Sequence, residues 1–326
     1  MKAIIVTKSG GPEVLAFQEV ETPAPGPEEV LIRVESAGVN YADIKARTSG
    51  IYQGRRPPFI PGLDVAGTIV ETGTAVEHLA AGQRVVAFPR TGSYAEMTVA
   101  DRRLTFPISD SLKFDTAAAF PVVCGAAYGT IAVAARLQTG ENILIHSAAG
   151  GVGSTAIQIA RSLGASMVIG ATGSLWKKDP ILSLGADQVV DTSGPDYPDQ
   201  VNDMTAGAGV DVILNPIGTK CLKNDLRCLA PFGRLVLFGN MGGGNSDLDF
   251  VSIYKNNRSL LGFSFGHRRK HRPETIAEIM QPVMDMIINH KIQIHIDKHL
   301  SLDQAAEAHR RIEERQNIGK ILLDIG

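Results

Sequence analysis

The sequence predicts an α/β protein in which a doubly wound parallel sheet follows a β-rich segment. The first observation is a glycine-rich turn, Ser147 to Gly153, between an apolar strand and a helical pattern. The second is a series of apolar runs separated mostly by helix-length stretches, at 143–146, 167–171, 188–190, 211–214, 234–238 and 259–265. This alternation is typical of parallel strands joined by right-handed crossovers.

Residues 1 to about 120 show short β-rich segments broken by glycine and proline. Strands are expected at Val30–Val34, Val65–Val70, Arg84–Phe88 and Tyr94–Val99. Six prolines punctuate these segments and exclude long helices there: Pro23, Pro25, Pro27, Pro57, Pro58 and Pro61. We therefore expect a first, mainly β domain over 1–120.

The glycine-rich turn predicts a nucleotide site. The buried strand Asn142–His146 leads into Ala148-Ala149-Gly150-Gly151-Val152-Gly153, and an amphipathic helix follows at once. Free backbone N–H groups and the positive end of the helix dipole converge there, which favours a diphosphate. Ala149, Gly150, Gly151, Val152 and Gly153 are the predicted cofactor contacts, although such turns also occur as purely structural elements.

The end of the next predicted strand favours NADPH over NADH. NAD-binding folds place an Asp or Glu on the ribose hydroxyls roughly 20 residues after the glycine turn. Here that position follows Met167–Ala171 and carries Gly173, Ser174 and Lys177, and the first acid is Asp179. A hydroxyl and an ammonium group suit a 2′-phosphate. The alternative is that Lys177 and Lys178 form a solvated helix start.

The chain beyond the alternating region is expected to return to the first domain. Two amphipathic helices are predicted near 274–290 and 303–315, and a closing strand at 320–325. The predicted division is therefore 1–120 completed by about 263–326, with the dinucleotide-binding domain at 121–262.

Composition excludes several classes of protein. The 326 residues are 44% hydrophobic and 20% charged, with a net charge of −2, which favours a globular protein and gives no broad attraction to nucleic acid or membranes. There is no apolar run of about 18 residues and no signal-peptide pattern, so a cytoplasmic protein is expected. The spacing of Cys124, Cys221 and Cys228 suggests neither disulfides nor a metal site.

Several motifs in order resemble a known family. They are Met1–Ile5, Ala37–Asp43, Pro61–Gly67, Ala148–Gly153, Phe238–Asn240 and Ile318–Lys320. Together they are similar to the medium-chain dehydrogenase/reductase superfamily, in particular its zinc-free quinone oxidoreductase branch, which includes zeta-crystallin-like proteins. The resemblance implies a GroES-like catalytic domain beside a Rossmann domain, NADPH as cofactor and a homodimer.

The same resemblance argues against a zinc site. Zinc-dependent relatives carry a Cys where Asn40 stands and a His where Leu63 precedes Asp64, and the segment Arg84–Tyr94 has no cysteine for their second zinc. Catalytic zinc needs three protein ligands. The C-terminal histidines are expected to be solvated: His267, His271, His290, His295, His299 and His309.

Without a metal, hydrogen-bond donors must stabilise the oxyanion that forms on a reduced substrate. Asn40 offers an amide, and Tyr41 and Tyr52 offer phenols beside an aromatic wall, although plain packing of the tyrosines is an equal alternative. Asp43, one helical turn after Asn40, is expected to orient its neighbours. Lys45 stands where the branch often has an aromatic residue, and this chain has one extra residue between Arg47 and Tyr52.

Two further loops are expected at the cofactor. Phe238, Gly239 and Asn240 end one strand at its carboxyl edge, and Phe263, Ser264 and Phe265 close the next. Met241–Gly244 predicts a flexible lid or turn. The basic cluster 267–272 is expected to be a solvated loop, with recognition of a phosphorylated substrate such as an acyl-CoA as the alternative.

We thus expect a zinc-independent, NADPH-dependent reductase of a quinone or an α,β-unsaturated carbonyl. The alternatives are an enoyl-thioester (acyl-CoA) reductase and a non-catalytic, crystallin-like NADPH-binding protein. The strand near Leu260–Phe265 is a candidate sheet edge that pairs across a homodimer.

Overall fold

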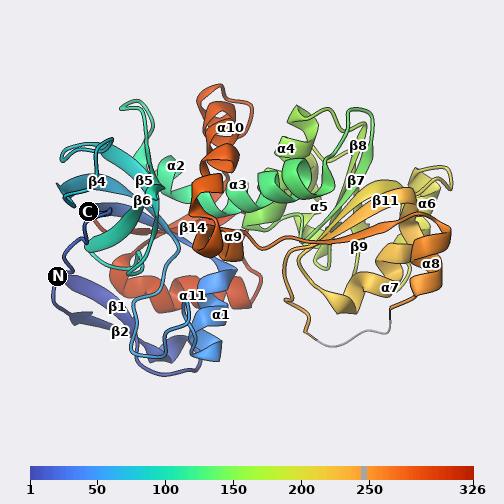
Figure 1. Ribbon diagram of the computed structural model, residues 1–326. Helices are drawn as coiled ribbons and strands as arrows, with labels where there is room; N and C mark the ends of the chain where they lie inside the picture. The colour runs from blue at the N-terminus through green and yellow to red at the C-terminus, as the bar shows by residue number, and fades with distance from the viewer. Residues whose placement is uncertain (244–247) are drawn as a thin grey trace. The chain divides into compact units, whose positions relative to one another are not determined.

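The computed structural model describes residues 1–243 and 248–326, which divide into two compact units (Figure 1). Unit 1 comprises Met1–Val122, Arg268–Gln281 and Ile294–Gly326, and unit 2 comprises Val123–His267 and Pro282–Gln293. Residues 263–267 and 282–293 thus belong with unit 2, although about 263–326 was expected to complete the first domain. Gly244, the last residue of the predicted lid or turn, lies outside the described residues.

Unit 1 is built on a curved six-stranded sheet with the order β13-β14-β3-β4-β5-β6. An additional pairing of β3 with β6 closes β3, β4, β5 and β6 into a ring of strands. β14 pairs antiparallel with β3, so the last strand does return to the first domain. The strands of unit 1 are β1 (Lys2–Val6), β2 (Leu15–Glu19), β3 (Glu29–Val39), β4 (Asp64–Thr72), β5 (Arg84–Pro89), β6 (Met97–Pro107), β13 (Ile296–Ser301) and β14 (Lys320–Asp324).

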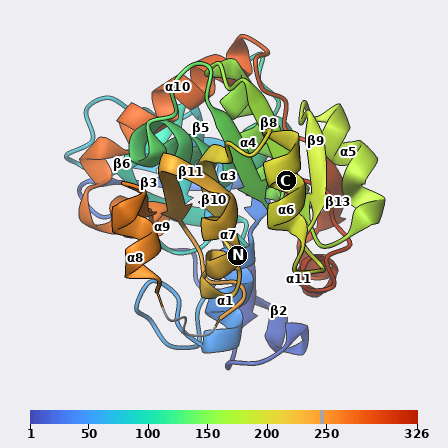
Figure 2. The same ribbon diagram turned by 90° about the vertical axis from the view of Figure 1, so that its right-hand side faces the viewer.

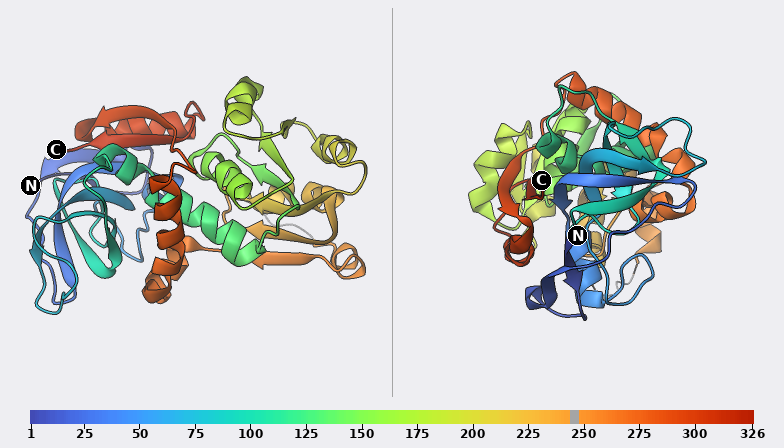
Figure 3. Two further views of the ribbon diagram at one scale, coloured as in Figure 1. Left: turned by 90° about the horizontal axis from the view of Figure 1, so that it is seen from above. Right: turned by 90° about the vertical axis from the view of Figure 1, so that its left-hand side faces the viewer.

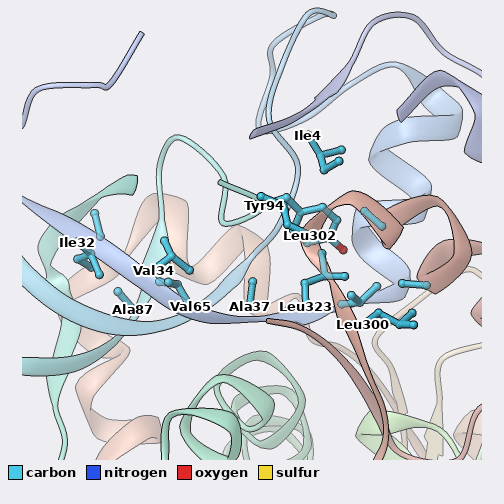
Figure 4. Close-up of a cluster of buried hydrophobic side chains, with 14 of the residues drawn as sticks. Ile4, Ile32, Val34, Ala37, Val65, Ala87, Tyr94, Leu300, Leu302 and Leu323 are labelled. Atoms are coloured by element: carbon cyan, nitrogen blue, oxygen red, sulfur yellow. The ribbon is translucent and has the colours of Figure 1, made fainter. Parts of the chain in front are cut away.

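The helices of unit 1 are few and short, as the prolines predict. They are α1 (Tyr41–Ser49), α2 (Phe114–Ala119) and α11 (Ala305–Glu313). The C-terminal α11 packs beside α1, which Figure 1 shows as a red helix next to a blue one. In Figure 3 the red C-terminal segment lies beside the blue strands of the N-terminal part. The core of the unit lies inside the sheet and unites residues from both ends of the chain, including Ile4, Val65 and Leu323 (Figure 4).

Unit 2 is a doubly wound parallel sheet with the order β12-β11-β10-β7-β8-β9 (Figure 2). Its strands are β7 (Asn142–His146), β8 (Met167–Thr172), β9 (Gln188–Asp191), β10 (Val210–Asn215), β11 (Leu229–Leu237) and β12 (Ser259–Gly262). All of the pairings are parallel. The strand order reverses between β7 and β10, where the carboxyl ends of the strands form a nucleotide crevice in such folds.

Helices connect the strands of unit 2. They are α4 (Gly151–Ser162), α5 (Lys178–Ser183), α6 (Tyr197–Met204), α7 (Thr219–Cys228) and α8 (Phe250–Lys255), together with the π-helical segment Gly129–Ala135. The helix α4 packs on β7 and β8, and α7 packs on β10 and β11. Three further helices include residues of both units: α3 (Pro121–Tyr128), α9 (Phe265–His271) and α10 (Ala277–Ile288).

Several predicted strands have different bounds in the structure, and the one expected at Tyr94–Val99 is observed as Met97–Pro107. The strand predicted at 234–238 begins at Leu229, because β11 continues through Pro231 and Phe232, and the latter adopts a left-handed φ of 64°. The strand predicted at 259–265 ends at Gly262, since Phe265 begins α9. None of the described helices combines the length and hydropathy that a membrane crossing requires.

Candidate active site and nucleotide edge

The turn between β7 and α4 presents an uncapped helix N-terminus. Gly150 is the N-cap residue, no side chain caps the helix, and its first turn contains no acidic residue. Ser147 has a left-handed φ of 54°, and its carbonyl oxygen accepts a hydrogen bond from the Gly150 N–H at 2.9 Å. A Cβ atom at Gly153 would lie 2.2 Å from that oxygen, so the helix can approach the strand only with glycine there. This geometry fits a diphosphate.

A buried lysine, Lys177, follows shortly after the end of β8. Lys177 is 6% exposed, and its ammonium lies 4.9 Å from the centre of the Trp176 ring. The Lys177 N–H donates to the Ser174 carbonyl, and the Ser174 N–H donates to the Thr172 hydroxyl, so a short turn holds these residues together. The alternative of a solvated helix start is therefore wrong for Lys177, whereas Lys178 is exposed.

The other predicted cofactor loops lie beyond β11 and β12. Gly239 and Asn240 are exposed, and Phe238 is half-buried. The rings of Phe263 and Phe265 pack within unit 2, because Cβ atoms at Gly129 and Gly125 would lie 2.2 and 2.4 Å from them. This second loop can therefore offer a ligand its backbone and Ser264, which is exposed.

In unit 1, Asn40 belongs to a buried cluster with Asp64 and Lys320. The Asn40 Nδ2 group donates to Asp64 Oδ2 at 2.9 Å and to the Gly38 carbonyl at 3.2 Å, while its Oδ1 accepts from Lys320 Nζ at 2.8 Å. Lys320 Nζ also donates to Asp64 Oδ2 at 2.9 Å. Both amide hydrogens of Asn40 thus have acceptors, and an ammonium neutralises the buried carboxylate.

Asp43 is the final acceptor in a chain of buried hydrogen bonds, and the donor at each step follows from which groups can donate. Arg47 can only donate, so His309 Nδ1 accepts from it at 3.3 Å and Nε2 carries the hydrogen that faces the Tyr94 hydroxyl at 3.2 Å. The Tyr94 hydroxyl then donates to Asp43 Oδ2 at 3.3 Å, which also accepts the Asn40 N–H at 2.9 Å. This last bond is one half of a capping box that starts α1.

The charge states along this chain follow from burial. Burial raises the pKa of the Asp43 carboxyl to about 7, because desolvation disfavours its ionised form, and Asp43 Oδ1 has no hydrogen-bond partner. Burial also lowers the pKa of His309 to about 3, so its imidazole is neutral. His309 is fully buried, and the expectation that it is solvated is wrong; the other C-terminal histidines are exposed.

The two candidate tyrosines differ in their surroundings. Tyr52 is buried, stacks on Phe59 with ring centres 5.2 Å apart, and donates its hydroxyl hydrogen to the Gly62 carbonyl at 2.7 Å. Burial raises the pKa of its phenol above the ordinary value. Tyr41 is half-buried at the first position of α1, and among the described residues its hydroxyl has no hydrogen-bond partner. Lys45 Nζ lies 5.7 Å from its ring centre.

The expectation that the basic cluster 267–272 is a solvated loop is wrong for its backbone, because residues 267–271 belong to the helix α9. Arg269 stacks on the Phe88 ring at 4.6 Å, and its Nη1 lies 3.5 Å from the Leu63 carbonyl oxygen. Burial lowers the pKa of its guanidinium, and nearby Asp64 opposes this. Lys270, His271 and Arg272 are exposed. The expectation of a solvated loop is therefore wrong for Arg269.

Sequence reasoning did not select five residues of this site: Asp64, Tyr94, Arg269, His309 and Lys320. Asp64 and Lys320 stood in motifs that carried the family resemblance, and that signal could have identified them. The pattern around Tyr94, Arg269 and His309 offers no comparable signal. Within the described residues, no group of three or more His, Cys, Asp or Glu side chains is placed to hold a metal ion.

Comparisons with known proteins agree with this architecture. Residues 26–110 match the family model "Alcohol dehydrogenase GroES-like domain", and residues 151–282 match "Zinc-binding dehydrogenase". The chain is 34% identical to a rat quinone oxidoreductase, over 99% of this chain and 97% of the relative. It is 31% identical to a segment of a Mycobacterium tuberculosis polyketide synthase subunit, over 98% of this chain and 14% of that protein.

The solved structures include a mycobacterial protein in complex with NADPH. It has a TM-score of 0.92 and 29% identity, and the match covers 99% of this chain and all of that one.

Asp43 is expected to make folding depend on pH. The folded carboxyl titrates near 7 and an unfolded one near 3.9, so its stabilising contribution is complete below the lower value and is lost as pH rises through the upper. The free energy of unfolding of the wild type, relative to Asp43→Asn, is expected to fall between about pH 4 and pH 7 in urea titrations. Asp110→Asn, at an exposed side chain, is the control. Parallel pH profiles for the wild type and Asp43→Asn would contradict the buried titration.

Proposed function

Because this chain belongs to the quinone oxidoreductase-like branch of the medium-chain dehydrogenase/reductase superfamily of oxidoreductases, we propose that it is a zinc-independent, NADPH-dependent reductase of quinones or α,β-unsaturated carbonyls. The observation that carries the proposal is the uncapped N-terminus of α4, with its glycine turn, on the same sheet edge as buried Lys177. The NADPH complex of the mycobacterial relative supports the choice of cofactor.

The residues of unit 2 fit the parts of the cofactor. Ala149, Gly150, Gly151, Val152 and Gly153 would bind the diphosphate through backbone N–H groups. Gly173, Ser174 and Lys177 would hold the 2′-phosphate, because an ammonium and a hydroxyl complement its charge. Two loops would flank the nicotinamide half, with contacts from Phe238, Gly239, Asn240, Phe263, Ser264 and Phe265.

Unit 1 would supply the substrate side. Bound NADPH would supply a hydride, and solvent or a side chain would supply the proton that completes a hydroquinone or a saturated carbonyl. The Tyr41 phenol would donate to the developing oxyanion. Asn40 and Asp43 would act as positioning residues, since the hydrogens of the Asn40 amide are engaged by Asp64 and Gly38. Tyr52, stacked on Phe59, would form an aromatic wall.

The zinc-independent assignment rests on the chemistry of the donor set. Catalytic zinc is held by three Cys, His or carboxylate ligands. Asn40 and Leu63 stand at two of the positions where zinc-dependent relatives carry such side chains, and the Asp64 carboxylate already pairs with Lys320 at 2.9 Å. We propose that fixed hydrogen-bond donors take over the electrostatic role of the metal.

The second candidate substrate class is an acyl thioester. The similarity to a polyketide synthase segment and the exposed Lys270, His271 and Arg272 favour this class, since basic side chains can bind the phosphates of an acyl-CoA. A non-catalytic, crystallin-like NADPH-binding protein is the third possibility. Comparison of quinone and enoyl-CoA turnover separates the three.

The decisive measurement is NADPH oxidation at 340 nm with 1,2- and 1,4-quinones, an enone and an enoyl-CoA. We expect turnover of quinones or the enone that a chelator leaves unchanged, and a decrease of about 10- to 100-fold in kcat for Tyr41→Phe. Tyr128→Phe, which changes another half-buried tyrosine, is the matched control.

Each other result has a defined meaning. Loss of activity with chelator would contradict zinc independence. Preference for enoyl-CoA would favour the second candidate, and tight NADPH binding without turnover of any substrate would favour a binding protein.

Lys177 is expected to determine cofactor preference. Lys177→Ala should raise KM for NADPH by about tenfold or more and leave KM for NADH nearly unchanged, because a 2′-phosphate loses its ionic partner. Lys178→Ala, at the adjacent exposed lysine, is the control and should change neither value. Equal effects of Lys177→Ala on both cofactors would place the 2′-phosphate elsewhere.

We also propose a homodimer formed through the open edge of the unit 2 sheet. β12 is an edge strand, and exposed Phe250, Val251 and Tyr254 lie on α8, just before it in the chain. Light scattering is expected to give twice the mass of one chain for the wild type and one chain for a Phe250→Glu/Tyr254→Glu variant. Trp176→Glu, at a similarly exposed aromatic residue, should remain dimeric. A monomeric wild type would refute the assembly.

A further inference from the structure

The carboxylate of Asp225 joins three elements inside unit 2. It is fully buried on α7 and accepts three hydrogen bonds: from His146 Nε2 at the end of β7 at 2.6 Å, from the Tyr197 hydroxyl on α6 at 2.7 Å, and from Asn215 Nδ2 at the end of β10 at 2.7 Å. The first two reach Oδ1 and the third reaches Oδ2. A carboxylate is an acceptor only, so every partner must present a hydrogen.

This requirement fixes the orientation of the Asn215 amide. With its Nδ2 group toward Asp225, its Oδ1 accepts the N–H groups of Ile217 and Gly218, both at 2.8 Å. A reversed amide would place NH₂ against two N–H donors and an oxygen against a carboxylate. The carboxylate on α7 thus determines the conformation of the turn 216–218.

That turn supports the segment that follows β11. The N–H groups of Met241 and Gly242 donate to the carbonyls of Pro216 and Ile217 at 3.1 and 2.8 Å. The two segments also approach closely at Gly239, where a Cβ atom would lie 2.5 Å from the Pro216 oxygen. On its other side, Asp225 binds His146, which immediately precedes the glycine-rich turn. One buried carboxylate therefore links both loops at the carboxyl edge of the sheet.

We propose that Asp225 is a positioning residue that sets the loops after β7, β10 and β11 for the diphosphate and nicotinamide half of the dinucleotide. The inference rests on the proposed function, because it takes the cofactor to lie along this edge. The adenosine end would lie at β8, whose residues are outside the Asp225 network. Loss of the network should therefore weaken binding of NADPH and spare 2′,5′-ADP, which contains neither the nicotinamide nor the full diphosphate.

An exchange of two side chains tests the hydrogen-bond pattern. Asp225→Asn presents a donor to Asn215, and Asn215→Asp places two carboxylates together, so each should weaken NADPH binding by about tenfold or more. The double variant Asn215→Asp/Asp225→Asn restores the bond between the two side chains, but it loses the bond that Asn215 Nδ2 donates to the Gly218 carbonyl at 3.2 Å in the wild type. The amide introduced at position 225 accepts from His146 and Tyr197 and donates to the carboxylate introduced at position 215, which in turn accepts the two backbone N–H groups. NADPH should therefore bind the double variant at least about threefold more tightly than either single variant.

Calorimetric titration with NADPH and with 2′,5′-ADP gives the two affinities. In the cofactor-free protein, the hydrogen-exchange rates of the Ile217 and Gly218 amides measure how stably the turn 216–218 is formed. Exchange should be faster in both single variants and slow again in the double variant. Asp199→Asn, which breaks an exposed pair between α6 and α7, is the control. Circular dichroism verifies that each variant folds.

The outcomes separate the two proposals. Failure of the wild type to bind NADPH would contradict the proposed function, while the exchange data would still test the turn. Wild-type binding with unchanged affinity in Asp225→Asn would overturn the inference. It would also be overturned if 2′,5′-ADP lost affinity equally, or if the folded double variant remained as weak as the single ones.

Discussion

The buried ion pair between Lys320 and Asp64 is the interaction on which unit 1 depends. A charge taken out of water must be matched by an opposite charge and by hydrogen bonds, and loss of one partner of such a pair costs about 3–5 kcal/mol. Lys320 Nζ has Val39 O, Asn40 Oδ1 and Asp64 Oδ2 as acceptors, and Asp64 Oδ1 accepts the Val122 N–H. The pair thereby ties the last strand to β3, β4 and the start of α1.

The position of Asn40 follows from this pair. Its amide lies between an ammonium and a carboxylate, so one orientation satisfies both. The close approach of the β3 backbone to Asp64 and to the end of α2 also requires glycine at position 38. A Cβ atom there would lie 2.6 Å from the Ala118 oxygen and 2.7 Å from Asp64 Oδ2. Once Asn40 is held, its backbone N–H donates to the Asp43 carboxylate, and this capping bond fixes the start of α1. The same carboxylate accepts the Tyr94 hydroxyl, which in turn contacts His309. Unit 2 uses a similar device in Asp225, a buried carboxylate that orients an asparagine and through it a loop.

Much of unit 2 could be predicted from the sequence because its strands are buried on both faces. Such strands appear as continuous apolar runs, and the runs predicted at 143–146, 167–171 and 188–190 correspond to β7, β8 and β9. The errors have local causes. β11 starts earlier than predicted because Pro231, Phe232 and Gly233 interrupt the apolar pattern while the backbone continues the ladder, with a register shift opposite Val210 and Val212.

The sequence by itself determined the features that depend on neighbouring residues: the glycine turn that frees the N-terminus of α4, the helix start at Asn40 and Asp43, and the alternation of strand and helix. These follow from backbone sterics and local hydrogen bonding, which act over a few residues. Tertiary structure alone decided that Lys177 and His309 are buried, that Tyr52 donates to Gly62, and that Lys320 lies 2.8 Å from Asn40 Oδ1. Partners such as Asn40 and Lys320 stand 280 positions apart, and packing of the sheet, rather than any local pattern, brings their charges and dipoles together.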